Sequence, residues 1–206
     1  MNEPRKLYIA DWHYGHANCI YFDARPFKDV EKMNKELVRR WNEAVNPCDT
    51  VYVLGDMFWC KGEEALAVLK QLNGNIILVK GNHDRCHDNR FAREFAKIDD
   101  YLEVDDNGRK IVLSHYPIPC YKNHFYGWLH LYGHVHTSFE WNMMEHNKYL
   151  MEELYTRPCE MYNTGAMLPY MDYTPRTLDE IIEGYKQMKG KKDEQEQKQK
   201  EASLCE

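Results

Sequence analysis

IILVKGNHD, residues 76–84, joins a run of four aliphatic side chains to the segment Gly-Asn-His-Asp. A short aliphatic run bounded by glycine is typical of a strand that is buried on both faces of an α/β sheet. The segment 81–84 then follows the carboxyl end of that strand. Ligands of open α/β sheets bind beyond the carboxyl ends of the strands. This stretch therefore predicts a buried strand and, directly after it, part of a binding site.

Four further apolar runs end in residues of the same kinds. They are followed by Asp11-Trp12-His13, Gly55-Asp56, Ser114-His115 and Gly133-His134-Val135-His136. Side chains two positions apart on an extended backbone point to the same side, so Asp11 converges with His13, and His134 with His136. Each segment alone fits ordinary turn chemistry. The five in this order predict one shared set of oxygen and nitrogen ligands, which suits two divalent metal ions.

Amphipathic helical stretches alternate with these strands, which indicates layered α/β packing. Apolar residues three or four positions apart predict helices over residues 29–45 and 62–72, and a short helix over about residues 88–97. Asn107-Gly108, between two β-rich runs, predicts a tight antiparallel hairpin.

One domain, residues 1–185, holds all of these elements. Its last helix is predicted to begin at a capping box formed by Thr177 and Glu180. Beyond it, residues 186–206 are dominated by lysine, glutamate, glutamine and small residues. We expect them to form a charged, solvated and disordered tail.

The composition is that of a packed globular protein. The chain has 206 residues, of which 43% are hydrophobic and 13% aromatic, and its net charge of −6 is not that of a strong duplex binder. No apolar run approaches the length of a membrane span or a secretory signal. The seven cysteines include no C-x-x-C pair, which favours reduced thiols. We therefore expect a cytoplasmic protein that does not associate with membranes.

The ordered segments resemble the signature of the calcineurin-like metallophosphoesterase superfamily: D-x-H, G-D, G-N-H-D/E, a lone His and G-H-x-H. The match spans residues 7 to about 185. Small prokaryotic and phage members share further segments, here Gly15-His16-Ala17-Asn18, Arg25-Pro26-Phe27, Asn163-Thr164-Gly165 and the stretch PRTLDEI at residues 175–181. The resemblance implies an α/β fold, a four-layer α/β/β/α sandwich of two mixed sheets, with the site across the strand ends.

The resemblance also implies a pair of metal ions, which would be manganese, iron or zinc because no thiol is among the ligands. One ion would be held by Asp11, His13, Asp56 and His136. The other would be held by Asp56, Asn82, His115 and His134. A carboxylate shared by both ions offsets their mutual repulsion.

The same resemblance implies hydrolysis of a phosphoester by a hydroxide that bridges the two ions. His83, next to a ligand but not itself one, is the candidate to stabilise the transition state or to protonate the leaving alkoxide. Asp84 would fix the tautomer and orientation of His83.

Two interpretations remain open for His16 and Arg25. Both lie just after the first motif and are candidates for binding the substrate phosphate, since a guanidinium fork fits phosphate oxygens. Alternatively, they form a hydrogen-bonded structural loop. The ring-rich stretch at residues 116–128 raises a similar choice between a nucleobase-stacking platform and simple packing at the rim of the site, which we favour.

We expect the substrate to be a small or nucleotide-like phosphoester, with a diester favoured over a monoester. A long nucleic acid is less favoured because the chain is acidic. The alternatives are a phosphomonoesterase, a non-catalytic metal-binding scaffold of the same fold and an amide hydrolase, against which Asn82, a neutral ligand, argues.

Overall fold

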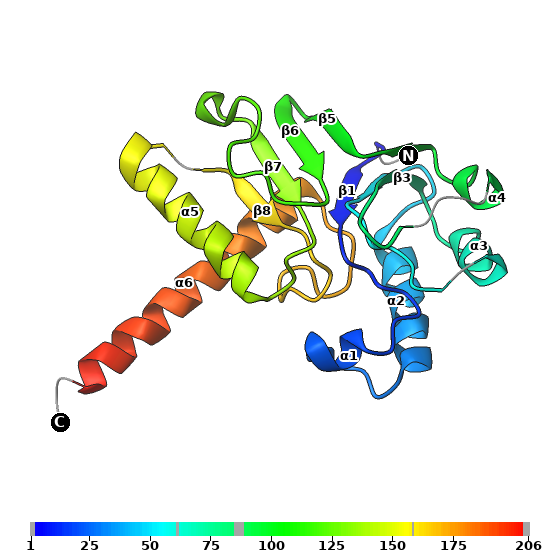
Figure 1. The fold of residues 1–206 in the computed structure, drawn as a ribbon, viewed down its shortest axis with the longest axis horizontal. Helices are drawn as coiled ribbons and strands as arrows, with labels where there is room; N and C mark the ends of the chain where they lie inside the picture. The colour runs from blue at the N-terminus through cyan, green and yellow to red at the C-terminus, as the bar shows by residue number, and fades with distance from the viewer. Residues whose placement is uncertain (1–2, 61, 85–88, 158, 204–206) are drawn as a thin grey trace.

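Two four-stranded sheets form the centre of the molecule in the computed structural model, which describes residues 3–60, 62–84, 89–157 and 159–203. Helices cover the outer side of each sheet (Figure 1). Buried side chains of both sheets, such as Ile9 and Leu131, belong to the same hydrophobic core. The predicted four-layer α/β/β/α arrangement is thus confirmed.

The first sheet has the strand order β1-β2-β3-β4, and all of its strands run parallel. The strands are β1 (Lys6–Ile9), β2 (Thr50–Val53), β3 (Asn75–Val79) and β4 (Lys97–Asp99). Helical crossovers connect them, and a crossover of this kind returns each strand in the same direction. The sequence had predicted two mixed sheets, but this one is parallel throughout.

The helices of this half are α1 (Cys19–Phe22), α2 (Val30–Ala44), α3 (Glu63–Leu69) and α4 (Asn89–Ala92). The Asp29 carboxylate caps α2 by accepting from the backbone of Lys32, and Leu37 and Trp41 are buried as the apolar spacing predicts. The helix predicted over residues 88–97 is shorter, because the chain enters β4 at its end. Residue 88 lies outside the described residues.

The second sheet is mixed, as predicted, with the order β5-β6-β7-β8. Its strands are β5 (Tyr101–Asp106), β6 (Arg109–Ser114), β7 (Leu129–Tyr132) and β8 (Met161–Asn163). β5 and β6 form the antiparallel hairpin predicted at Asn107-Gly108, where φ is +54° and +81°. A single residue, Asp100, lies between β4 and β5 and joins the two sheets.

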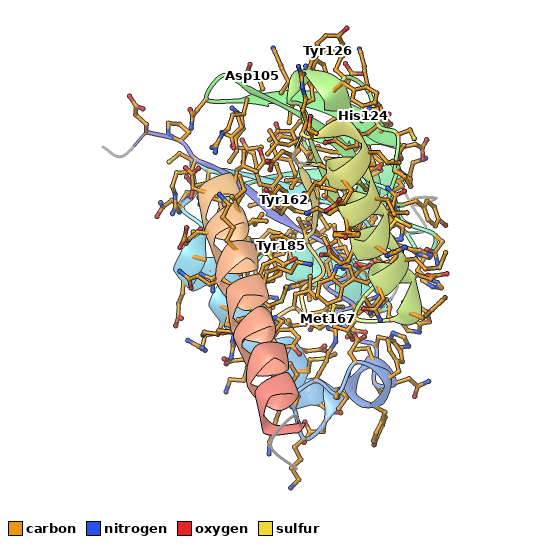
Figure 2. The ribbon with its side chains drawn as sticks, turned by 90° about the vertical axis from the view of Figure 1, so that its left-hand side faces the viewer. Asp105, His124, Tyr126, Tyr162, Met167 and Tyr185 are labelled. Atoms are coloured by element: carbon orange, nitrogen blue, oxygen red, sulfur yellow. The ribbon has the colours of Figure 1, made fainter. Side chains whose placement is uncertain are left out.

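Two long helices cover the second sheet: α5 (Phe139–Tyr155) and α6 (Leu178–Ser203). Between them the buried Lys148 ammonium donates to the Met161 carbonyl and the Tyr185 hydroxyl, at 2.8 and 3.1 Å. Figure 2 shows Tyr162 and Tyr185 in the space between the two helices, with their ring centroids 5.2 Å apart. The sequence did not predict α5, because several of its apolar side chains, among them Phe139 and Leu154, are exposed.

The C-terminal helix begins as predicted but ends later. Thr177 and Glu180 form the capping box, in which the Thr177 amide donates to the Glu180 carboxylate at 2.8 Å. The helix continues to Ser203 and extends away from the sheets (Figure 1), whereas the sequence predicted a disordered tail from residue 186. Lysine, glutamine and glutamate are good helix formers even without a core to pack against. Residues 204–206 lie outside the described part.

Two expectations about the chain's environment concern its helices and cysteines. Within the described residues, none of the helices combines the length and apolar character required to cross a membrane. The cysteines of the described part, Cys19, Cys48, Cys60, Cys120 and Cys159, are all free thiols.

His130 on β7 shows how polar groups are accommodated in the second sheet. Its side chain is fully buried, its Nδ1 donates to the Val112 carbonyl, and its Nε2 accepts from the amide of Ile118, each at 3.0 Å. Burial lowers the pKa of His130 to about 4. His130 is therefore a neutral structural residue.

This buried histidine predicts a pH dependence of stability. The folded-state pKa lies below the ordinary value of 6.5, so protonation favours the unfolded chain and stability is lost as the pH falls from 6.5 towards 4. Between about pH 7.5 and about pH 4.5, the wild type should lose about 2–3 kcal/mol more unfolding free energy than His130→Gln. Urea titrations at both pH values measure the difference. The control variant His146→Gln, at an exposed position of α5, should behave as the wild type. If His130→Gln loses as much unfolding free energy as the wild type, His130 is not the buried neutral residue described here.

Candidate metal centre

The loops that follow β1, β2, β3, β6 and β7 meet at one end of the two sheets. The backbone amide of His134 donates to the Asp11 carboxylate, with N–O distances of 2.9 and 3.2 Å, and so joins the loop after β7 to that after β1. The amide of His83 donates to Asp56 Oδ1 at 2.9 Å and joins the loop after β3 to that after β2. The predicted ligands are thereby brought together across both sheets.

One group of ligand atoms comes from Asp11, His13 and His136, and these atoms all lie within 4.8 Å of one another. His136 Nε2 is 3.8 Å from Asp11 Oδ1, and Asp56 Oδ2 lies 4.0 Å from His13 Nε2. This is the set that the sequence assigned to the first metal ion.

A second group surrounds the Nε2 atom of His115. That atom is 3.0 Å from Asn82 Oδ1, 3.2 Å from His134 Nδ1 and 3.7 Å from Asp56 Oδ2. The His115 Nδ1 atom is paired with the Leu54 carbonyl at 2.8 Å, which leaves Nε2 as the atom that faces the group. These are the residues that the sequence assigned to the second ion, and Asp56 is next to both groups.

The donor atoms fit divalent cations. His13 Nε2 is buried and has no hydrogen-bond partner in the described structure. Burial, and next the charge of Arg25, lower the pKa of His13 and keep its ring neutral, as a metal ligand must be. Burial raises the pKa of the Asp11 carboxyl to about 6. A bound cation would give His13 Nε2 a partner and would favour the ionised form of the Asp11 carboxyl.

The backbone is strained at these positions. A φ in the left-handed region, which non-glycine residues seldom adopt, occurs at Asp11, His13, Asp56, His134 and His136, with values between +47° and +70°. Such conformations persist where the surrounding structure imposes them, and they cluster at functional sites. The sequence holds no signal for them beyond the tolerance of Asp and His for this region.

Gly81 explains why a glycine precedes Asn82 in the GNHD segment. A Cβ atom at this position would lie 2.2 Å from Asp56 Oδ1 and 2.7 Å from the Asp56 backbone nitrogen. The absence of a side chain therefore lets the loop after β3 approach the carboxylate that lies between the two groups.

The sequence predicted that Asp84 orients the His83 ring, and this prediction is wrong. The Asp84 carboxylate accepts instead from three backbone amides, those of Asp56, Gly81 and Met57, at 2.7, 2.8 and 3.0 Å. Asp84 therefore fixes the loop that carries Asp56, rather than orienting the imidazole of His83.

Of the two roles left open for Arg25, the structure supports the hydrogen-bonded structural loop. The residue is 3% exposed, and its guanidinium donates to the backbone carbonyls of Asp11 and Trp12, each at 3.0 Å, and to the Asp23 carboxylate at 2.9 Å. All of these contacts lie inside the protein, so the guanidinium is not turned towards a substrate phosphate.

Asp23 is a site residue that sequence reasoning missed. Its Oδ1 accepts from His136 Nδ1 at 2.7 Å, while Arg25 holds its other oxygen. Burial opposes a charge on His136, but Asp23 and Asp11 outweigh it and raise the pKa of that imidazole. This contact leaves Nε2 of His136 as the atom directed to the centre. Asn163, from the N-x-G segment, donates to the His136 carbonyl at 2.9 Å.

His16 lies beside the centre without belonging to either ligand group. Its Nδ1 is 3.3 Å from Nδ1 of His13, and its ring stacks on Trp59 with centroids 3.7 Å apart and an interplanar angle of 5°. Burial, and next the charge of Arg25, lower the pKa of His16. A role in substrate binding stays a prediction for this residue.

Residues 4–164 match the family model described as calcineurin-like phosphoesterase. The chain belongs to this family. The predicted recognition is thereby confirmed. The family and the groups of possible metal-binding residues together support metal-dependent phosphoester hydrolysis.

Three proteins similar to this phosphoesterase cover between 53% and 88% of its length. An uncharacterized protein of Methanocaldococcus jannaschii is 35% identical over 86% of this chain and 90% of its own. The Gene 66 protein of Mycobacterium phage L5 is 30% identical over 53% of this chain and 62% of its own. A protein of unknown function from Aquifex aeolicus, AQ665, has a crystal structure that matches with a TM-score of 0.66 and 29% identity, covering 88% of this chain and 99% of that one.

The carboxylate that orients His136 provides a test of the phosphoesterase's metal centre. Asp23→Asn should weaken binding of Mn²⁺ by about 10–100-fold, because the amide no longer fixes the tautomer and basicity of the imidazole. Calorimetric titration of metal-stripped protein measures the affinity. Asp179→Asn, which removes the same charge from an exposed position, is the matched control. Equal affinities in the two variants would contradict the role of Asp23.

Proposed function

We propose that this phosphoesterase hydrolyses a phosphodiester of a small or nucleotide-like substrate with two divalent metal ions. The observation that carries the proposal is the position of His83. Its side chain is 43% exposed, and its Nε2 lies 3.9 Å from Oδ2 of Asp56, the carboxylate next to both ligand groups. A phosphoryl group bound beside Asp56 would therefore be within reach of an accessible imidazole.

When bound, the ions supply an activated water and neutralise the charge that develops on the phosphoryl oxygens. The protein's own part is to hold the ligands in place through the carboxylates of Asp11, Asp23 and Asp84. We propose Asp56 as the carboxylate shared by both ions. The nitrogen and oxygen donors suit manganese, iron or zinc.

His83 is proposed as the general acid. As the oxygen of water forms its bond to phosphorus, the bond from phosphorus to the leaving oxygen breaks, and the imidazolium of His83 gives its proton to the departing alkoxide. The products are an alcohol and a phosphomonoester. An alkoxide is a poor leaving group, so it needs this proton more than a nitrophenolate does.

The position of Arg25 favours a diester over a monoester. A monoester phosphate carries a second negative charge, for which a guanidinium fork is a good partner. Arg25 is instead committed to backbone carbonyls and to Asp23. The remaining alternatives, a phosphomonoesterase and a non-catalytic metal-binding scaffold, are outcomes of the experiment below.

The proposed partner is a small phosphoester rather than a long nucleic acid, because a net charge of −6 offers little attraction to a polyanionic backbone. We further propose a cytoplasmic location, supported by the free thiols of the described cysteines.

The first test compares bis-p-nitrophenyl phosphate with p-nitrophenyl phosphate, using metal-stripped protein reloaded with Mn²⁺. We expect diester turnover that requires metal and is lowered about 100-fold or more in Asp56→Ala, since the charge stabilisation supplied by a metal ion is worth several kcal/mol. Turnover of the monoester alone would replace the proposal with a phosphomonoesterase. Metal binding without turnover of either ester would support the scaffold.

Replacement of the proposed acid gives a second prediction. His83→Ala should lower kcat for an alkyl diester such as thymidylyl-thymidine by about 10²–10⁴-fold, with a much smaller loss for bis-p-nitrophenyl phosphate, whose leaving group departs without a proton. Steady-state kinetics on both substrates measure the difference. His146→Ala, at an exposed position of α5, is the control. Equal losses on the two esters would refute the acid role.

A further inference from the structure

Three exposed aromatic rings surround the candidate metal centre. Phe22 at the end of α1, Trp59 in the loop after β2 and Tyr116 in the loop after β6 are 57%, 40% and 50% exposed. Each ring lies within 6 Å of the imidazole of a candidate ligand. Single exposed rings are common on protein surfaces, but these come from separate elements and meet at one site.

Trp59 is the most firmly positioned of the three. Its backbone amide donates to the Tyr14 carbonyl at 2.8 Å, and the imidazole of His16 covers one face of its ring. The exposed surface therefore lies on the parts of the ring that His16 does not cover. The ring centroid is 4.4 Å from that of His83, the proposed acid.

Phe22 and Tyr116 stand next to different ligands. The Phe22 ring is 5.7 Å from that of His136, in the first ligand group. The Tyr116 ring is 4.5 Å from that of His134 and 5.1 Å from that of His115, in the second group. The Ser114 hydroxyl donates to the Tyr116 carbonyl at 2.7 Å and fixes the backbone there. An ester bound at both groups would thus have an aromatic ring near each.

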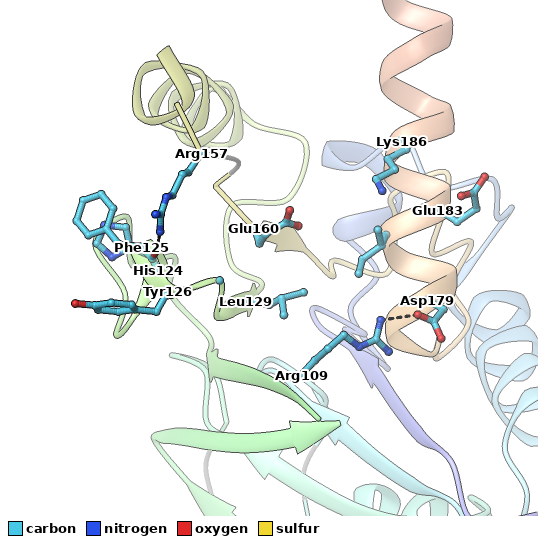
Figure 3. A pocket seen from close by; sticks show the side chains of 12 residues that line it. Arg109, His124, Phe125, Tyr126, Leu129, Arg157, Glu160, Asp179, Glu183 and Lys186 are labelled. Carbon is cyan, nitrogen blue, oxygen red and sulfur yellow. Dashed lines mark hydrogen bonds and ion pairs between the residues drawn. The ribbon is translucent and has the colours of Figure 1, made fainter. Parts of the chain in front are cut away.

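The ring-rich stretch considered from the sequence contributes only its first member. Tyr121 is 2% exposed and belongs to the core of the second sheet. Phe125 and Tyr126 precede β7 and line a pocket that also contains Arg109 and Asp179 (Figure 3). In Figure 2, Tyr126 lies at the upper end of the molecule and Met167 well below it, and Met167 adjoins Gly165, next to Asp11. The exposed rings at that pocket are therefore remote from the metal centre.

We propose that Trp59, Phe22 and Tyr116 bind a planar aromatic group of the ester by stacking. The inference rests on the proposed function only in placing the phosphoryl group at the metal ligands. A ring attached to that group would cover apolar surface that is otherwise exposed to water, and stacking of a base on an aromatic side chain strengthens binding. The bound group is a nucleobase or an aryl ring, which present the same flat π-face.

Binding of phosphates that differ only in their organic group tests this proposal. Mn²⁺-loaded protein is titrated calorimetrically with methyl phosphate, phenyl phosphate and thymidine 5′-phosphate. Methyl phosphate reports the contact with the metal centre alone, and the ratio of its Kd to that of each ring-bearing phosphate reports stacking. We expect a ratio of about 10 in the wild type, since 1.4 kcal/mol corresponds to a tenfold change in affinity.

Variants identify the rings responsible. The ratio should fall towards 1 in Trp59→Leu and decrease in Tyr116→Leu, while Trp59→Phe should retain much of it. Tyr126→Leu, at an 83% exposed ring outside the site, is the matched control and should keep the wild-type ratio. Binding of Mn²⁺ to each variant confirms that the centre is intact.

The outcomes separate the two proposals. A wild-type ratio near 1 with measurable binding of methyl phosphate would overturn the stacking proposal and leave the proposed function standing. Methyl phosphate is of the same type as the phosphomonoester product of the proposed reaction. If it does not bind to the Mn²⁺-loaded wild type, that result would count against a phosphoryl site at the metal ligands, and so against the proposed function itself. Equal affinities for phenyl and thymidine phosphates would support recognition of any planar ring. Tighter binding of the thymidine phosphate would support a nucleoside.

Discussion

The hydrogen bond from the His134 amide to the Asp11 carboxylate connects the two sheets at the point where the chemistry is placed. Asp11 follows the first strand of the parallel sheet, and His134 follows a central strand of the mixed one. Each ligand group takes residues from both sheets, so this contact and the pairing of His115 Nδ1 with the Leu54 carbonyl hold the members of both groups together. The same principle recurs at Asp56 and Asp84, whose carboxylates accept from amides of neighbouring loops. Acidic side chains therefore hold the ligand-bearing loops together.

This arrangement has an energetic cost that a cation offsets. Asp11 is fully buried with a raised pKa, His13 carries an unpaired ring nitrogen, and both have a left-handed backbone. Each of these features destabilises the metal-free fold by an amount typical of strained functional sites. The hydrophobic core, with residues such as Trp41 and Leu37, provides the stability that offsets these costs.

The sequence predicted well what depends on local patterns. The apolar run at residues 76–79, the Asn107-Gly108 turn and the Thr177 capping box each specify a structure by themselves. It predicted poorly what depends on distant partners. The apolar residues of α5 show no clear helical period in the sequence, and β8 is too short to recognise. In the site, the order of the motifs predicted which candidate metal ligands lie together. No pattern revealed that Asp23 orients His136 or that Arg25 donates to backbone carbonyls. Those contacts arise only when loops far apart in the sequence meet.

The connection between the sheets has a kinetic meaning. Because Asp100 alone separates β4 from β5, the parallel and mixed halves have no linker on which to hinge. A protein built in this way is not expected to bind substrate by hinge closure of two domains. Whatever must move to admit an ester or release an alcohol is restricted to side chains and short loops at the rim, which rearrange much faster than whole domains. We therefore expect turnover to proceed without a domain-closure step.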